Sequence, residues 1–132
     1  MRLKHLPGPN CNSCNLKLIG AHAEIRKWFL ENVKPLFPDT HVSCAWRDFK
    51  KQKEYFDNGQ SKARPGQSKH NFLDQYGEPC ARALDLFKLS AEGKAEFPTE
   101  HYEEIARKCH DEKIKWGGEF QSISDGTHFE LV

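Results

Sequence analysis

A chain of 132 residues is long enough for one domain with a buried core and too short for two. Its 20 lysines and arginines nearly balance its 19 acids, so a net charge of +1 excludes a general electrostatic attraction to nucleic acid or to an anionic membrane. The mean hydropathy is −0.80, and no apolar run approaches the roughly 20 residues of a membrane span. We therefore expect a single soluble domain over residues 1–132, monomeric, with neither nucleic acid nor membrane as a partner.

The N-terminal segment is predicted to be an irregular lead-in over residues 1–15, rich in proline, glycine and asparagine. Its sequence, "MRLKHLPGPNCNSC", lacks the apolar core of a secretory signal. We therefore expect synthesis in the cytoplasm without a signal peptide.

The five cysteines are an odd number, so they cannot all pair within one chain. In a reducing compartment the expectation is free, mostly buried thiols. Cys11 and Cys14 have the Cys-x-x-Cys spacing of a metal or redox pair, but a structural zinc site usually needs a second such pair and the sequence has none. We interpret Cys11 and Cys14 as loop thiols, with a second zinc site or a redox pair as the alternatives.

The first half of the chain predicts two helices around one strand. Apolar residues recur at helical spacing over residues 18–34, and Pro35 and Pro38 end that helix. Residues 41–46 alternate as a short strand, which places three side chains on one face: Val42, Cys44 and Trp46. A second helix is predicted over residues 47–59, with its two phenylalanines inward: Phe49 and Phe56.

The second half begins with a long polar loop over residues 60–79, and a loop of that length in a compact domain is more often functional than decorative. An alternating strand follows over residues 81–89. Residues 97–113 predict a third helix, whose buried stripe would be Tyr102, Ile105, Ala106 and Cys109. Residues 114–132 read as two short strands around turns. Helices mixed with hairpin-capable strands indicate an α+β protein, with a small antiparallel sheet and flanking helices.

Two of these strands carry polar side chains on one face. In the strand over residues 81–89, Asp85 points away from Leu84 and Leu86, and an aspartate on a mostly apolar strand is costly unless it is paired or bound to a metal. In the last strand, His128 faces the same way as Glu130. Both strands therefore offer candidate functional groups on one side.

These groups suggest a metal centre. With His70 from the long loop, Asp85 and His128 complete two histidines and a carboxylate, a usual protein set for a catalytic zinc whose fourth position holds water. Asp125, three residues before His128, would be placed to accept a proton from that water and to pass it to a leaving amine.

Simpler interpretations stay open at this point. A histidine in a chain with seven is more often a surface residue, and Asp85 could form a structural salt bridge with Arg82 or Arg47. Asp125 and the glycine after it could form only a turn.

Several motifs resemble a known family in the same order. "SKHN", "ARALDLF", "WGGEF" and "SDGTHFEL" are similar to zinc peptidases of the VanY and D-alanyl-D-alanine carboxypeptidase group, and the likeness is greatest to phage L-alanyl-D-glutamate endolysins of the hedgehog/DD-peptidase fold. "AWRDFKKQ" resembles the family's Arg-x-x-x-x-Gln segment, and "IKWGG" its stretch before the final strand. The resemblance covers roughly residues 18–132.

The resemblance implies zinc as cofactor, with His70, Asp85 and His128 as ligands and Asp125 as general base. It also implies a substrate-side role for Arg47, which could stabilise the developing oxyanion or hold a substrate carboxylate.

Three more residues have two interpretations each. Ser68 could bond a peptide carbonyl or only shape its loop. Trp116 could wall the cleft, or be a core tryptophan before a tight turn. Glu130 could support a ligand or be a solvated strand residue.

The sequence departs from the family pattern between two implied ligands. Fourteen residues separate His70 from Asp85, a longer stretch than in the family, and the glycine expected four residues before Asp85 is Ala81. The insertion contains Asp74 and Glu78, which makes Asp74 a rival ligand. We prefer Asp85, because a rigid strand positions a ligand better than a loop does.

The resulting hypothesis is a zinc metallopeptidase that hydrolyses the stem peptide of bacterial peptidoglycan. We expect a phage or prophage endolysin with L-alanyl-D-glutamate endopeptidase activity, which would reach the wall through a phage-made membrane pore. The alternatives are a D-alanyl-D-alanine carboxypeptidase, a non-catalytic zinc-containing binding module of the same fold, and a structural protein without metal.

Overall fold

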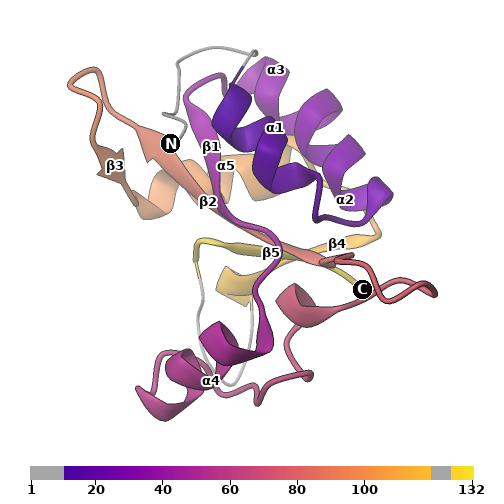
Figure 1. Ribbon diagram of the computed structural model, residues 1–132. Coiled ribbons are helices and arrows are strands. Elements are labelled where there is room, and N and C mark those ends of the chain that lie inside the picture. Colours follow the sequence, from indigo (N-terminus) through magenta and orange to yellow (C-terminus); the bar gives the residue numbers. More distant parts are fainter. Residues whose placement is uncertain (1–10, 120–125) are drawn as a thin grey trace.

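The computed structural model describes residues 11–119 and 126–132, and it builds them around one antiparallel sheet (Figure 1). The strand order is β1-β2-β5-β4, and a short β3 also pairs with β2. The strands are β1 Thr40–Cys44, β2 Ala83–Leu89, β3 Ala95–Glu96, β4 Ile114–Trp116 and β5 His128–Leu131. The C-terminal strand β5 is therefore central, between β2 and β4.

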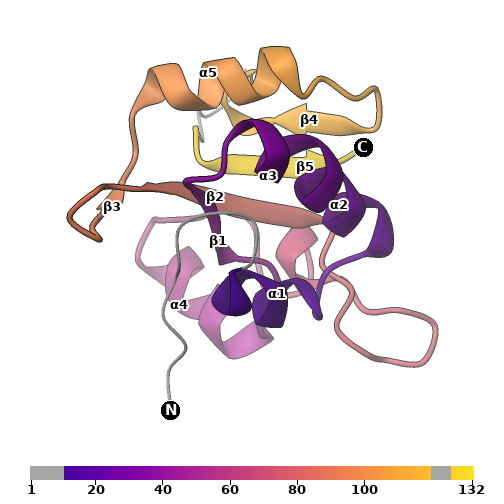
Figure 2. The ribbon, with the colours of Figure 1, turned by 90° about the horizontal axis from the view of Figure 1, so that it is seen from above.

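Helices lie on both sides of this sheet. Figure 2 shows α5 on one side of the sheet and α4 on the other. The helices are α1 Asn12–Leu18, α2 Ala23–Trp28, α3 Lys34–Leu36, α4 Phe49–Asp57 and α5 Thr99–Lys108, with a π-helical turn η1 Phe29–Val33 and the 3₁₀ turns η2 Lys69–Asn71 and η3 Gly117–Glu119. The α+β class predicted from the sequence is confirmed.

One hydrophobic core joins one face of the sheet to α2 and α5. Its members include Ile25, Phe29, Leu84, Leu86, Ile105, Phe129 and Leu131. Two buried polar groups are satisfied inside it: the Tyr102 hydroxyl donates to the Leu86 carbonyl at 2.7 Å, and Trp28 Nε1 donates to the Cys109 carbonyl at 2.8 Å. The buried stripe expected for the third helix is therefore present, with Tyr102, Ile105 and Cys109 buried and Ala106 packed at its edge.

The N-terminal region differs from the expected lead-in and single helix. A helix already starts at Asn12, inside the stretch predicted to be irregular, and the helix expected over residues 18–34 is interrupted after Leu18. At the interruption, a Cβ on Gly20 would lie 2.9 Å from Cβ of Trp46, so this close approach needs glycine. His22 then begins α2, because its Nδ1 accepts from the Glu24 amide at 3.1 Å. Helical periodicity does not report such a break.

The helix α4 buries a different side chain from the one expected. Of the two phenylalanines predicted to point inward, Phe49 is 47% exposed and Phe56 is only partly buried, whereas Gln52 is fully buried. The Gln52 amide accepts from Arg47 Nη1 at 2.9 Å and donates to Ser61 Oγ at 2.9 Å and to the Ala63 carbonyl at 2.7 Å. A polar network therefore joins α4 to the loop that follows it.

None of the helices in the described ranges is both long enough and apolar enough to cross a bilayer.

Candidate metal centre and active site

Three neighbouring strands bring a row of functional side chains to one face of the sheet. In the antiparallel register, Asp85 of β2 lies opposite Cys44 of β1 on one side and opposite His128 of β5 on the other. Leu84, Phe129 and Leu131 point to the opposite face and belong to the core. The alternation read from the sequence therefore predicted the correct face for Asp85 and His128.

This row lies in a cavity of about 610 Å³. Its floor is the sheet, and its wall is α4 with the polar loop that follows. The lining residues are Arg47, Tyr55, Gln60, Ser61, Lys62, Ala63, Gln67, Ser68, Lys69, His70, Asp85, His128 and Glu130. The long polar loop is thus part of the site, as its length indicated.

His70 is held on the short turn η2 with one ring nitrogen already used. Ser68 begins η2 by accepting from the His70 amide at 3.2 Å. The His70 Nδ1–H donates to the Ala45 carbonyl at 2.7 Å. The other nitrogen, Nε2, is buried, lies 3.4 Å from Asp85 Oδ2 and has no hydrogen bond of good geometry among the described residues. His70 therefore presents Nε2 to the carboxylate.

His128 shows the same arrangement with the ring nitrogens exchanged. Its Nε2 donates to Glu130 Oε1 at 2.9 Å, and Glu130 is itself held by Lys69 at 2.9 Å. The Nδ1 atom lies 3.1 Å from Asp85 Oδ1. A metal-bound histidine characteristically donates its other ring N–H to a carboxylate or a carbonyl, which orients the ring. Glu130, which the sequence left undecided, accepts this hydrogen bond from His128.

Electrostatic interactions within the cluster outweigh the effect of burial on the pKa values of its members. Burial alone would lower the pKa of His70 and of His128, but the carboxylate of Asp85 raises these pKa values to about 10 and about 9. Burial would raise the pKa of Asp85, yet the two histidines hold it well below its usual range. Likewise, His128 and Lys69 overcome burial and lower the pKa of Glu130 to about 2. Without a metal, protons balance the Asp85 charge, and a bound dication would replace them.

The donor set fits zinc in kind. Zinc takes histidine nitrogens and carboxylate oxygens at about 2.0–2.2 Å, so neighbouring ligand atoms of a tetrahedral ion lie roughly 3.3 Å apart. His70 Nε2 lies 3.4 Å from Asp85 Oδ2 and His128 Nδ1 lies 3.1 Å from Asp85 Oδ1, so each histidine meets a different oxygen of the carboxylate at close to this separation. The three residues named from the sequence thus come together with suitable atoms facing one another. Their role as ligands stays a prediction.

Arg47 closes one side of this group. Its Nη2 lies 3.2 Å from Asp85 Oδ2, its Nη1 bonds Gln52, and its guanidinium stacks 4.3 Å above the centre of the Tyr55 ring. Of the two salt-bridge partners considered for Asp85, the structure thus selects Arg47, while Arg82 donates to the Val132 carbonyl at 3.4 Å. The contact leaves both interpretations of Asp85, metal ligand and salt-bridge partner, compatible in one site.

Cys44 joins the site through an irregularity that the alternating pattern could not show. A register shift between Val42 and Cys44 leaves Val42 in the core and turns Cys44 toward Asp85. Its thiol sulfur, Sγ, accepts from Arg47 Nη2 at 3.6 Å and lies 3.8 Å from His70 Nδ1. Cys44, His70 and Asp85 have donor atoms within 4.8 Å of one another, but the His70 atom nearest to Cys44 already bonds the Ala45 carbonyl. Cys44 therefore lies on the Nδ1 side of the His70 ring, whereas Nε2 of that ring faces Asp85.

The remaining predicted residues divide into three cases. Ser68 lines the cavity, where its hydroxyl begins η2. Asp125, the expected general base, lies outside the described residues. Asp74, the rival ligand, lines a different cavity, and its Oδ1 accepts from the amides of Tyr76 and Glu78 in the turn of the insertion. The insertion therefore extends away from the candidate site.

Trp116 is not brought to this cavity. Its ring stacks on Phe129 with a centroid distance of 6.5 Å, and its Nε1 donates to the Gly126 carbonyl at 2.8 Å. A Cβ on Gly118 would come within 2.3 Å of the indole, so the glycine allows the ring to fold over the chain. These contacts favour the core interpretation of Trp116, since the β4–β5 register directs its ring to the Phe129 side, and a substrate contact of this residue stays a prediction.

Comparison with known proteins gives a fold relationship. No protein-family model and no curated protein matches the chain. A crystal structure of the Serratia marcescens L-Ala D-Glu endopeptidase ChiX matches with a TM-score of 0.67 and 24% identity, covering 90% of this chain and 86% of ChiX.

Two structures of a vancomycin-resistance peptidase also match. The D,D-pentapeptidase VanY from a VanB-type cassette, an E175A mutant in complex with Zn(II), gives a TM-score of 0.54 at 16% identity, covering 85% of this chain and 72% of VanY. VanYB in complex with D-alanine-D-alanine gives 0.52 at 18% identity, covering 83% and 70% of the two chains. The resemblance seen in the sequence motifs is thus confirmed as a shared fold.

Proposed function

We propose that this protein is a zinc peptidase that hydrolyses the stem peptide of bacterial peptidoglycan. One observation carries the proposal: two histidines each use one ring nitrogen to bond a protein acceptor and direct the other at the same carboxylate of Asp85. A purely structural ion pair needs neither the second histidine nor the oriented rings. The similar folds of ChiX, an L-Ala D-Glu endopeptidase, and of a VanY peptidase complexed with Zn(II) support the same function.

In this proposal His70, Asp85 and His128 would hold the metal. A bound zinc ion supplies Lewis-acid polarisation of the scissile carbonyl and acidifies the attacking water. Asp125 accepts the proton of that water and delivers it to the departing nitrogen, which general acid–base catalysis requires. Glu130 and Lys69 keep His128 oriented.

Arg47 adds a fixed positive charge at the wall of the cavity. Because Gln52 and the Tyr55 ring hold its guanidinium, the charge can stabilise the developing oxyanion or a substrate carboxylate with little reorganisation. Ser68 lines the cavity, and its hydroxyl begins η2, the turn that carries His70.

We assign the bond between L-alanine and D-glutamate as the one cleaved. The ChiX structure, with the higher TM-score and coverage, comes from an enzyme with that activity. VanYB binds D-alanine-D-alanine on a related fold, which makes a D-alanyl-D-alanine carboxypeptidase the second candidate. A role as a phage or prophage endolysin is supported by the motifs that resemble those of phage members. A zinc-holding module without catalysis would have no use for Asp125 as a general base.

Mass spectrometry of muropeptides separates these functions. Purified peptidoglycan digested with the zinc-loaded protein should yield glycan-linked L-alanine and free peptides beginning with D-glutamate. Loss of a terminal D-alanine alone would instead identify a carboxypeptidase. Unchanged muropeptides would overturn the peptidase proposal. Protein treated with a chelator serves as the matched control and should regain activity when zinc is restored.

A further inference from the structure

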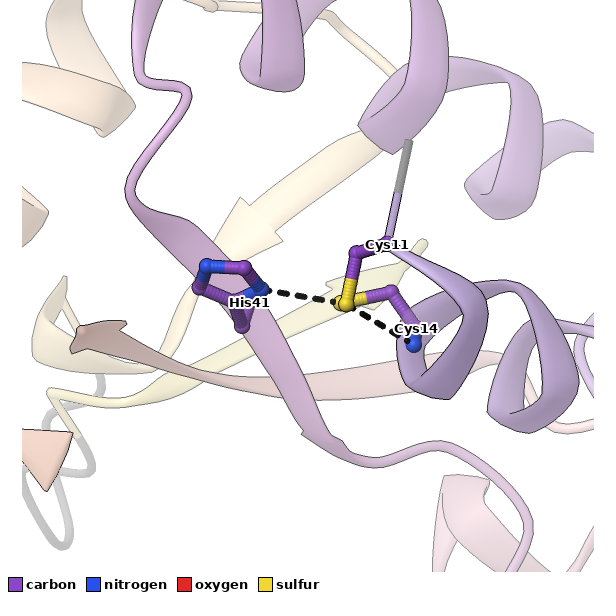
Figure 3. Close-up of side chains that lie close together, drawn as sticks. All are labelled: Cys11, Cys14 and His41. Carbon is purple, nitrogen blue, oxygen red and sulfur yellow. Dashed lines mark hydrogen bonds between the residues drawn. The ribbon is translucent and has the colours of Figure 1, made fainter. Parts of the chain in front are cut away.

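A second cluster of metal-binding side chains lies outside the candidate active site. Cys11, the N-cap of helix α1, and Cys14 within α1 meet His41 of β1, and Figure 3 shows the three side chains directed at one another. Their donor atoms all lie within 4.8 Å of one another, with Cys14 Sγ 3.3 Å from His41 Nδ1. The cysteines are 1% exposed and the histidine 0%, so water does not reach the cluster freely.

Backbone amides are aimed at both sulfurs. The Cys14 amide donates to Cys11 Sγ at 3.4 Å, and the Val42 amide donates to Cys14 Sγ at 3.3 Å. A neutral thiol is a weak acceptor, whereas a thiolate, the form that binds metals, is stabilised by such N–H groups. The sulfurs therefore lie in surroundings suited to metal ligands.

The imidazole of His41 presents the correct atom. Lys34 Nζ donates to the carbonyls of Pro38 and Thr40, both at 2.8 Å, and lies 3.5 Å from His41 Nδ1. Since an ammonium group can only donate, this contact fits the tautomer of His41 that carries its lone pair on Nδ1. The same nitrogen faces Cys14. A metal binds a neutral imidazole through such a lone pair, so Nδ1 and the two sulfurs could bind one ion.

We propose that Cys11, Cys14 and His41 hold a structural zinc ion that fastens α1 to β1. Two cysteines and a histidine form a soft donor set that favours zinc among the common divalent ions. With Zn–S and Zn–N distances of about 2.3 and 2.1 Å, tetrahedral ligand atoms lie roughly 3.4–3.8 Å apart, a spacing the cluster can reach with small shifts. A fourth ligand, water or a further side chain, would complete the tetrahedral coordination.

An ion at this cluster would stabilise the short helix α1 against the sheet. The helix α1 has only seven residues, fewer than an isolated helix needs, and its Leu16 and the C-capping Ile19 are exposed. Leu18 packs into the core and Lys17 Nζ donates to the Val42 carbonyl at 3.2 Å, and an ion bound by both cysteines and His41 would add to these contacts between α1 and β1.

A redox pair or a nucleophile fits the same residues less well. Burial raises the pKa of the Cys14 thiol to about 12, whereas reactive cysteines have lowered pKa values and some exposure to solvent. Cys11 and Cys14 form no disulfide in the structure. The alternative of a second zinc site, left open by the sequence, is therefore the one that the structure favours over loop thiols.

Thiol modification of the wild-type protein tests the site without any variant. Protein purified under reducing conditions with zinc should hold two equivalents, and a mercurial that blocks thiols should release one of them. The other equivalent, bound by histidines and a carboxylate, should remain. If the active-site proposal fails, the total falls to one equivalent that is still released by the mercurial. If thiol modification releases no zinc, the cluster binds none and this proposal is overturned.

Cobalt substitution assigns the released ion to its residues. Thiolate ligands give Co(II) a charge-transfer absorption in the near ultraviolet, which the His70, Asp85 and His128 set does not produce. The band should be lost in Cys14→Ser and kept in two controls, Cys109→Ser, a buried thiol elsewhere, and Cys44→Ser, the thiol beside the other site. A band that disappears only in Cys44→Ser would contradict the assignment. If Cys14→Ser does not fold, the mercurial result decides.

Discussion

Replacing Asp85 with asparagine is expected to remove zinc from the cavity and to abolish peptidoglycan hydrolysis. The carboxylate is the only acid in contact with both candidate histidines within the described part of the chain, with Oδ2 toward His70 and Oδ1 toward His128. Asparagine keeps the shape but removes the charge, and it leaves Arg47 without its ion-pair partner. Since changing a residue that merely orients a ligand already costs about 10–100-fold in metal affinity, losing a ligand should cost more than roughly 100-fold.

Zinc competition with a coloured chelator, together with muropeptide release, measures both effects. Asp74→Asn is the matched control, because Asp74 bonds only the turn of the insertion in the structure and should keep metal and activity. Glu130→Gln should fall between them, with zinc affinity lowered about 10–100-fold through the loss of orientation at His128. The reverse order, with Asp74→Asn inactive and Asp85→Asn active, would show that the insertion supplies the ligand.

Replacing Asp125 with asparagine is expected to have the second large effect, on rate alone. Asparagine cannot accept and redeliver a proton, so hydrolysis should fall by at least roughly 10²-fold, the contribution typical of general acid–base catalysis. Zinc content should stay that of the wild type, because Asp125 is not expected to be a ligand. The role rests on its position three residues before His128 and on the motif resemblance.

The control for this variant is Asp57→Asn, which changes an exposed residue of α4 that pairs with Lys53 at 2.6 Å. Single-turnover digestion with equal zinc loading isolates the chemical step from metal binding. Asp125→Asn protein that cut peptidoglycan at the wild-type rate would remove the general base from the mechanism. Loss of zinc in the same variant would mean that Asp125 is a ligand.

The face of each site residue could be predicted because strand alternation is a local property. Asp85 among leucines, and His128 and Glu130 between core residues, had only one arrangement that buries the apolar side chains. The order of the strands in the sheet then places β2 beside β5, so that Asp85 and His128 become cross-strand partners. Alternation alone does not show that Asp85 and His128 meet. That expectation came from the ligand set and from the order of the family motifs.

Features that depend on long-range packing could not be predicted in this way. The register shift that brings Cys44 to the site, and the stacking of Trp116 on Phe129, depend on how neighbouring strands fit. The meeting of Cys11 and Cys14 with His41 spans about a fifth of the chain, and only the packing of α1 on β1 shows it. A Cys-x-x-Cys pair without a second pair gave no sign of its partner.

Anomalous diffraction at the zinc absorption edge, on crystals of the zinc-loaded protein, tests the metal centre most directly. We expect a zinc peak in the cavity bonded to His70 Nε2, His128 Nδ1 and the carboxylate of Asp85 at about 2.0–2.2 Å. Data from Asp85→Asn crystals should lack that peak. A cavity without zinc in the wild-type protein, or a zinc ion held by Cys44 in place of His128, would contradict the proposed centre and the peptidase mechanism that depends on it.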